Sequence, residues 1–74
     1  MPHYRVDATQ RLVGEIVVTT SHFFEAHDLR SAEVLADIWV EIKLLSETSA
    51  TDLRLVQADV IVAARPLKDR TWGH

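Results

Sequence analysis

The stretch Glu15-Ile16-Val17-Val18-Thr19-Thr20 and the later run Val60-Ile61-Val62-Ala63-Ala64 decide the fold. β-branched residues are restricted at χ1 and fit a pleated strand better than a helix. The segment between the two runs reads as helix over much of its length, because Ala, Leu and Glu dominate its first half. The sequence therefore predicts a small α+β fold. We expect an antiparallel or mixed sheet of three to four strands, with one main helix packed on one face.

Three segments are predicted to supply the strands. Residues 4–8 alternate apolar and polar side chains, which is typical of a strand with one solvated face, and residues 12–20 form the second expected strand. Apolar residues also recur at helical spacing from Gln10 to Phe24, so a helix there is the alternative, which the Val-Val-Thr-Thr run disfavours. Residues 53–64 read as one further strand that Pro66 ends, because proline has no N–H for a ladder.

The main helix has two possible starts. Thr20 or Ser21 can cap it, and so can Asp28 or Ser31, because each offers a side-chain oxygen to the free N–H groups of the first turn. An apolar face at helical spacing is expected to pack on the sheet. Its members are Leu29, Ala32, Leu35, Ala36, Trp39, Ile42 and Leu45. Residues 38–45 also alternate, so that this part fits a helix or a strand, and residues 46–52 read as a polar connection.

Length and composition indicate one small domain over residues 1–74, with residues 67–74 as a candidate flexible tail. The chain has no cysteine, so neither a disulfide nor a zinc–thiolate site stabilises it. The net charge of −3 and the acidic balance of residues 25–47 oppose binding to duplex nucleic acid. No apolar run is long enough to cross a membrane and the N-terminus lacks the apolar core of a signal peptide, so we expect a cytoplasmic protein with no membrane partner.

No complete catalytic or metal constellation is present. His22, Glu25 and His27 cluster in sequence, but the two histidines lack the four-residue spacing of a zinc helix. We therefore predict that the protein is not an enzyme and holds no metal or cofactor. Glu33, Asp37 and Glu41 recur every four residues opposite the apolar face, and we assign this acidic helix face to binding a protein partner.

A single sheet with one helix leaves its second face uncovered. Val13, Val17, Ile61 and Ala63 are expected on that outer face, together with aromatic residues not used in the core. Exposed apolar patches usually mark an interface, and an unpaired strand edge offers a second route to association. A homo-oligomer is therefore predicted, and the leading interpretation is a self-associating interaction or regulatory protein.

Two resemblances provide alternative functions. Thr19-Thr20-Ser21, Trp39-Val40-Glu41-Ile42 and the run from Val56 to Ala63 are similar to segments of the dodecins, small flavin-binding proteins that assemble into dodecamers. In that family a tryptophan at a strand start stacks on the isoalloxazine and a glutamine on the next strand bonds its edge. The resemblance implies that Trp39 and Gln57 bind a flavin.

The second resemblance concerns the chain ends. Met1-Pro2, a following strand, and Trp72-Gly73 after a later strand look like the 4-oxalocrotonate tautomerase family, which uses an N-terminal proline. Removal of the methionine would leave the secondary amine of Pro2, and an α-amino group titrates near neutral pH and can act as a general base. This resemblance implies a Pro2-dependent tautomerase.

Overall fold

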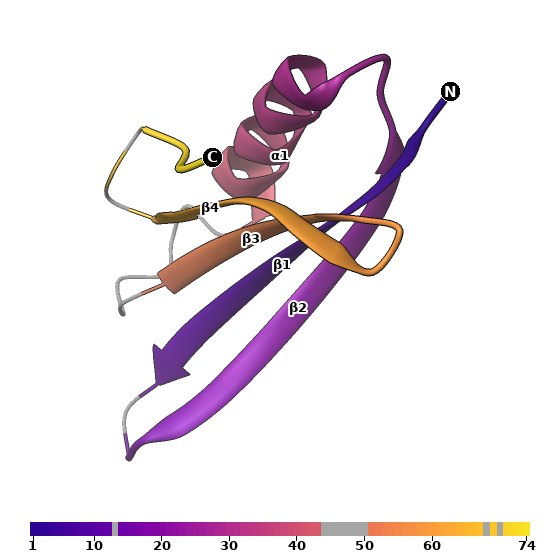
Figure 1. Cartoon of the computed structure of the whole chain (residues 1–74). Helices are drawn as coiled ribbons and strands as arrows, with labels where there is room; N and C mark the ends of the chain where they lie inside the picture. The colour runs from indigo at the N-terminus through magenta and orange to yellow at the C-terminus, as the bar shows by residue number, and fades with distance from the viewer. Residues whose placement is uncertain (13, 44–50, 68, 70) are drawn as a thin grey trace.

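The computed structural model describes residues 1–12, 14–43, 51–67, 69 and 71–74. One helix lies across one face of a four-stranded antiparallel sheet, which confirms the predicted α+β class (Figure 1). The elements in chain order are β1 (His3–Leu12), β2 (Ile16–Glu25), α1 (Leu29–Lys43), β3 (Thr51–Gln57) and β4 (Val60–Pro66). The strand order in the sheet is β2-β1-β3-β4, so β1 is an inner strand and β2 and β4 are the two edges.

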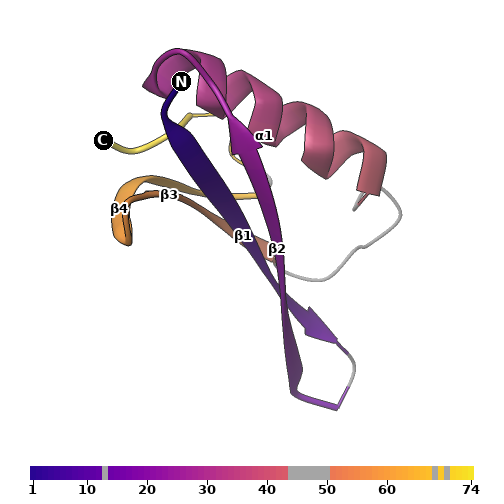
Figure 2. The ribbon, with the colours of Figure 1, turned by 90° about the vertical axis from the view of Figure 1, so that its right-hand side faces the viewer.

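The β1–β2 hairpin is the longest feature of the molecule. Its register pairs His3 with Glu25 at one end and Leu12 with Ile16 at the other, without a break. The helix covers only the part of the hairpin near the chain start, and the other end projects away from it (Figure 2). Residues Ile16 to Phe23 of β2 are consequently exposed on both faces of the sheet.

Helix α1 begins at the second of the two predicted starts. The Ser31 backbone N–H donates a hydrogen bond of 2.8 Å to Oδ1 of Asp28, which places Asp28 as the N-cap. This hydrogen bond, followed by that from the Ser31 side chain, lowers the pKa of Asp28 from its ordinary value of 3.8. The predicted start at Thr20 or Ser21 is wrong, because β2 pairs with β1 as far as Glu25.

A small core fills the space between the sheet and α1. Its fully buried residues are Val6, Ala8, Ala32, Ala36, Leu53 and Leu55. Alanine on the helix side brings the backbone of α1 close to the sheet, where larger side chains would hold it away. The buried helix face runs through Ala32, Ala36 and Val40, so Leu35 and Ile42 of the predicted apolar face point to solvent instead.

The predicted strand over residues 53–64 is a hairpin. Ala58 and Asp59 form its two-residue turn with φ angles of +51° and +63°, and Gln57 pairs with Val60 on either side. Both turn residues occupy the left-handed region, as the turn type that matches the twist of two strands requires. The reversal, together with a register shift between Leu55 and Val56, brings Ala63 into the core rather than onto the predicted outer face.

The other predictions from the sequence concern residues 38–52 and the outer sheet face, and some of these residues lie outside the described ranges. Residues 38–43 are helical, whereas residues 44 and 45 and most of the predicted polar connection lie outside the described residues. Val17 and Ile61 are exposed on the outer sheet face as expected, and Val13 lies outside the described residues.

Candidate interaction surfaces

The last residues of the chain return to the domain and contact both β4 and α1. Gly73 and Ala64 exchange two backbone hydrogen bonds, of 2.8 Å and 3.3 Å, so Gly73 adds one residue of pairing outside β4. A Cβ on Gly73 would lie 3.3 Å from the Ala64 carbonyl oxygen, so a larger residue at position 73 would crowd this pairing. Trp72, half-buried beside Gly73, packs against the core. The described residues of the predicted flexible tail therefore have defined contacts.

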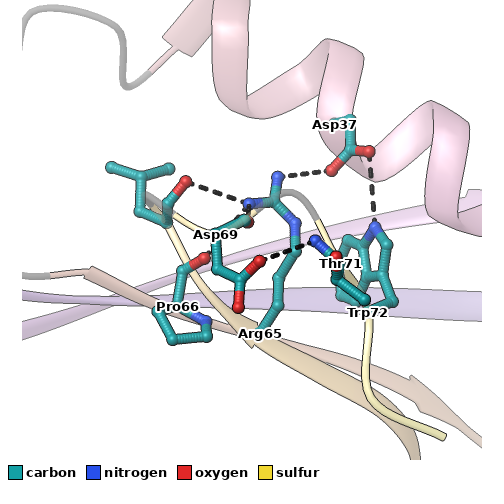
Figure 3. Close-up of polar contacts among 7 residues, drawn as sticks. Asp37, Arg65, Pro66, Asp69, Thr71 and Trp72 are labelled. Atoms are coloured by element: carbon teal, nitrogen blue, oxygen red, sulfur yellow. Dashed lines mark hydrogen bonds and ion pairs between the residues drawn. The ribbon is translucent and has the colours of Figure 1, made fainter.

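A polar cluster joins these terminal residues to the helix, and we call Asp37, Arg65 and Trp72 the C-terminal clamp (Figure 3). Nη2 of Arg65 donates to Oδ1 of Asp37 at 2.5 Å, and Nε1 of Trp72 donates to Oδ2 at 3.3 Å. The guanidinium carbon of Arg65 also lies 5.0 Å from the centre of the Trp72 ring, within the range of a cation–π contact.

Arg65 is the central residue of the clamp. Only 6% of its side chain is exposed, and its Nη1 donates to the backbone carbonyls of Pro66, Leu67 and Asp69. A buried guanidinium must be paired, and here the Asp37 carboxylate and three backbone carbonyls accept its hydrogen bonds. Its Nε is buried without a hydrogen-bond partner among the described residues. The clamp thus fixes one flank of α1 over β4.

A stack of rings holds the opposite flank of α1 over β2. The rings of His22 and Trp39 are 5.4 Å apart and nearly parallel, at 5°. His22 in turn stacks on Phe24 at 5.9 Å, and Phe24 on Tyr4 at 6.0 Å. Each such aromatic contact adds about 0.5–1.5 kcal/mol beyond simple burial. The helix is therefore anchored by side chains on both of its flanks.

Four large aliphatic side chains of α1 are exposed on the side away from the sheet, and we call Val34, Leu35, Ile38 and Ile42 the outer stripe. Their exposed fractions are 53%, 42%, 47% and 70%, respectively. Val34, Ile38 and Ile42 follow each other at four-residue spacing, so they line one side of the helix. A shallow hollow of about 410 Å³ is lined by Arg30, Ser31, Val34 and Leu35. A surface of this kind is typical of a docking site.

The acidic residues predicted to bind a partner lie directly beside the outer stripe. Glu33 and Asp37 already interact within the chain, because Glu33 contacts Nε2 of His74 and Asp37 belongs to the clamp. Glu41 is exposed near the end of α1 and also has an interaction of its own. The partner-binding role of these three residues stays a prediction.

The residues implied by the two resemblances lie as follows. Trp39 is in the third turn of α1 and stacks on His22, so it does not stand at the strand start that the dodecin resemblance implies. Gln57 is half-buried at the end of β3. Pro2 is exposed before β1, and its carbonyl accepts a hydrogen bond of 3.2 Å from the Ala26 N–H.

The described part of the chain contains no group of three or more His, Asp or Glu side chains that could hold a metal ion. No helix within it has the length and apolar character required to cross a membrane.

Comparison with protein-family models, curated proteins and solved structures gave no significant match to this chain. The class is therefore defined by the structure, as a small α+β domain with a helix anchored on a single antiparallel sheet.

The sequence reasoning did not identify the outer stripe or the clamp. The signal for the stripe was present, since Val34, Ile38 and Ile42 repeat every four residues beside the acidic row. The clamp had no local signal, because 28 residues separate Asp37 from Arg65 and 35 separate it from Trp72.

Proposed function

We propose that this chain is a small non-enzymatic interaction domain that self-associates and holds a protein partner on the outer stripe of α1. The exposure of four large aliphatic side chains on one side of a single helix carries this proposal. Burying such side chains stabilises an interface by about 25 cal/mol for each Å² of apolar surface removed from water. In the isolated chain these side chains stay in water and this stabilisation is absent. Exposed apolar clusters of this kind usually mark a binding surface.

The chemistry beside the stripe indicates which partner fits. Glu33, Asp37 and Glu41 precede Val34, Ile38 and Ile42 by one residue each, so a row of carboxylates borders the apolar row. An amphipathic helix with aliphatic residues at four-residue spacing and Lys or Arg along one border complements this surface. The charge of Asp37 is offset by Arg65, so the negative potential that attracts such a segment comes from Glu33 and Glu41.

The anchoring of α1 also supports this role. The C-terminal clamp and the stacked rings hold the helix from both flanks before any partner arrives. A surface that is already ordered loses less conformational entropy on binding than a mobile one. The outer stripe is in this sense preorganised for docking.

A pair of matched substitutions tests the partner site. Ile38 on the stripe and Ile61 on β4 are both exposed isoleucines, with fractions of 47% and 55%. Tagged wild-type protein, Ile38→Glu and Ile61→Glu should be used to capture partners from cells, followed by affinity measurement with the purified partner. We expect Ile38→Glu to weaken binding at least tenfold and Ile61→Glu to leave it within about twofold, since a buried charge is unfavourable only inside the interface.

Two results would contradict the partner site. A partner bound equally well by wild type and Ile38→Glu does not use the stripe, and a partner lost only in Ile61→Glu uses the sheet instead. Thermal unfolding of all three proteins should accompany the binding data, so that loss of binding is not confused with loss of the fold.

A further inference from the structure

The two edges of the sheet differ in how they are protected. Beside β4, Gly73 pairs with Ala64, Pro66 lacks an N–H, and the register shift at Leu55 and Val56 distorts the ladder. These are features that stop an edge strand from pairing with another chain. Among the described residues nothing pairs with the outer edge of β2, which continues over Ile16–Glu25 with neither proline nor register shift.

Strand β2 also lacks the charged residues that usually prevent an edge strand from pairing with another chain. From Ile16 to Phe24 the strand has no Asp, Glu, Lys or Arg, and charged residues are what normally block edge-to-edge pairing. Its side chains are β-branched, aromatic, Ser or His, and all of them up to Phe23 are exposed. Among the large apolar residues whose burial is described, Phe23 has the largest exposed fraction, 73%.

We infer that β2 is the self-association surface, pairing antiparallel with β2 of a second copy across a twofold axis at Thr20. The product is a continuous sheet of eight strands with both helices on the same face. This inference, which rests on the self-association part of the proposed function, names the surface and the register. It is independent of the partner site on α1.

The side-chain pattern of β2 selects this register. Directly opposite residues of an antiparallel pair point to the same face, so even-numbered residues must meet even-numbered ones. With Thr20 on the axis, Ile16 lies opposite Phe24 of the second copy and Val17 opposite Phe23. Aromatic and β-branched residues are a favourable cross-strand combination, worth about 0.2–1 kcal/mol for each pair.

Neighbouring registers match less well. An axis at Thr19 leaves Phe23 and Phe24 with no strand residue opposite, because Glu15 lies in the turn before β2 with a φ of +64°. An axis at Ser21 sets Val17 opposite Glu25, which places a carboxylate against an apolar side chain. In the register at Thr20 the paired segment runs from Ile16 to Phe24, and the only like charges near each other are Glu25 and Glu15 in the hairpin turn of the second copy. Replacing Glu25 with Gln should therefore tighten the dimer slightly, and added salt should do the same.

Cysteine cross-linking tests the register directly, because the chain has no cysteine of its own. Opposite residues of an antiparallel pair have Cα atoms about 4.5–5.5 Å apart, which a disulfide can bridge. We expect Thr20→Cys to form a covalent dimer under mild oxidation faster than Thr19→Cys or Ser21→Cys. Val60→Cys, at an exposed position on the opposite edge strand β4, is the control and should stay monomeric on a non-reducing gel.

A second pair of variants tests the edge without cross-linking. Thr20→Lys places two ammonium groups opposite each other on the axis, whereas Thr71→Lys makes the same change at an exposed position away from β2. Sedimentation velocity should be run over roughly 1 to 100 µM, a range that suits a dimer with a micromolar dissociation constant. We expect wild type and Thr71→Lys to dimerise in this range. Thr20→Lys should raise the dissociation constant at least tenfold while keeping the far-UV circular dichroism of the wild type.

The outcomes separate this inference from the proposed function. A wild-type dimer that survives Thr20→Lys, or that cross-links best through Val60→Cys or another β2 position, overturns the inference and leaves self-association intact. A wild-type protein that remains monomeric over the whole range overturns both. Binding of a partner through Ile38 is measured separately and is affected by neither result.

Discussion

Oδ1 of Asp37 on α1 lies 2.5 Å from Nη2 of Arg65 on β4, across 28 residues of sequence. This contact joins the only helix to the edge of the sheet within the described part of the chain, and Trp72 strengthens it by bonding the other carboxylate oxygen. The pair is asymmetric, because 6% of the Arg65 side chain but 39% of the Asp37 side chain is exposed. The buried cation therefore depends on the carboxylate more than the carboxylate depends on it.

Substitution Asp37→Asn should lower the free energy of unfolding by about 2 kcal/mol, since it leaves a buried guanidinium without its counter-charge. This loss of stability is smaller than that expected for a fully buried ion pair, because water reaches Asp37. Urea unfolding of a double-mutant cycle with Arg65→Met measures the coupling, which should be about 1–2 kcal/mol. Asp52→Asn, the same change at an exposed carboxylate of β3, is the control and should have little effect.

Asp28 makes the stability depend on pH at acid values. Its pKa is lowered in the folded chain by the Ser31 backbone hydrogen bond, so its contribution is complete above the ordinary value of 3.8 and is lost as the pH falls through the lower folded value. Asn also caps helices but carries no charge. The melting temperature of the wild type should therefore exceed that of Asp28→Asn at pH 6, and the difference should vanish near pH 2. A constant difference across that range would contradict the assignment.

The turn between β3 and β4 is a site for stabilising changes. Ala58 adopts a φ of +51°, where Asn is better accommodated than other non-glycine residues and a β-branched residue is poorly accommodated. Ala58→Asn should raise the free energy of unfolding by about 0.5–1 kcal/mol, and Ala58→Val should lower it. Thermal melts of both variants suffice, because Ala58 is exposed and burial does not confuse the comparison.

Gln10 is a buried amide on β1 with 6% of its surface exposed. Its Nε2 has no hydrogen-bond partner among the described residues, and a buried unpaired donor costs about 1–3 kcal/mol. Gln10→Met keeps the length of the side chain and removes the donor, so it should stabilise the protein by about 1 kcal/mol in chemical unfolding. A destabilised variant would mean that the amide makes a bond essential to the fold.

Local patterns predicted much of this fold. The β-branched run of residues 15–20 and the alternation of residues 4–8 indicated β2 and β1, and Asp28 was one of the candidate caps for the helix start. Local propensity left the end of β2 open, because residues 20–25 also suited a helix start. Pairing with β1 settles it, and β2 extends to Glu25.

Other features had no local signal. Ala58 and Asp59 are not a typical turn pair, so the hairpin of β3 and β4 was read as a single strand. The helix turns its alanines inward and its larger Leu35 and Ile42 outward, which hydrophobicity alone does not predict. The clamp depends on a chain reversal that brings Trp72 back to Asp37, and no spacing rule describes such a contact.

The position of β1 inside the sheet also sets the order in which the protein can be completed during translation. Its pairing with β2 uses only residues 3–25, whereas its other side waits for residues 51–57 to leave the ribosome. Until then the nascent hairpin has two free edges and no clamp, because Arg65 and Trp72 follow residues 51–57 in the chain. Nascent chains are most prone to aggregation while strand edges are unpaired, so the interval between the emergence of residue 25 and that of residues 51–57 is when this protein is most exposed to misassembly.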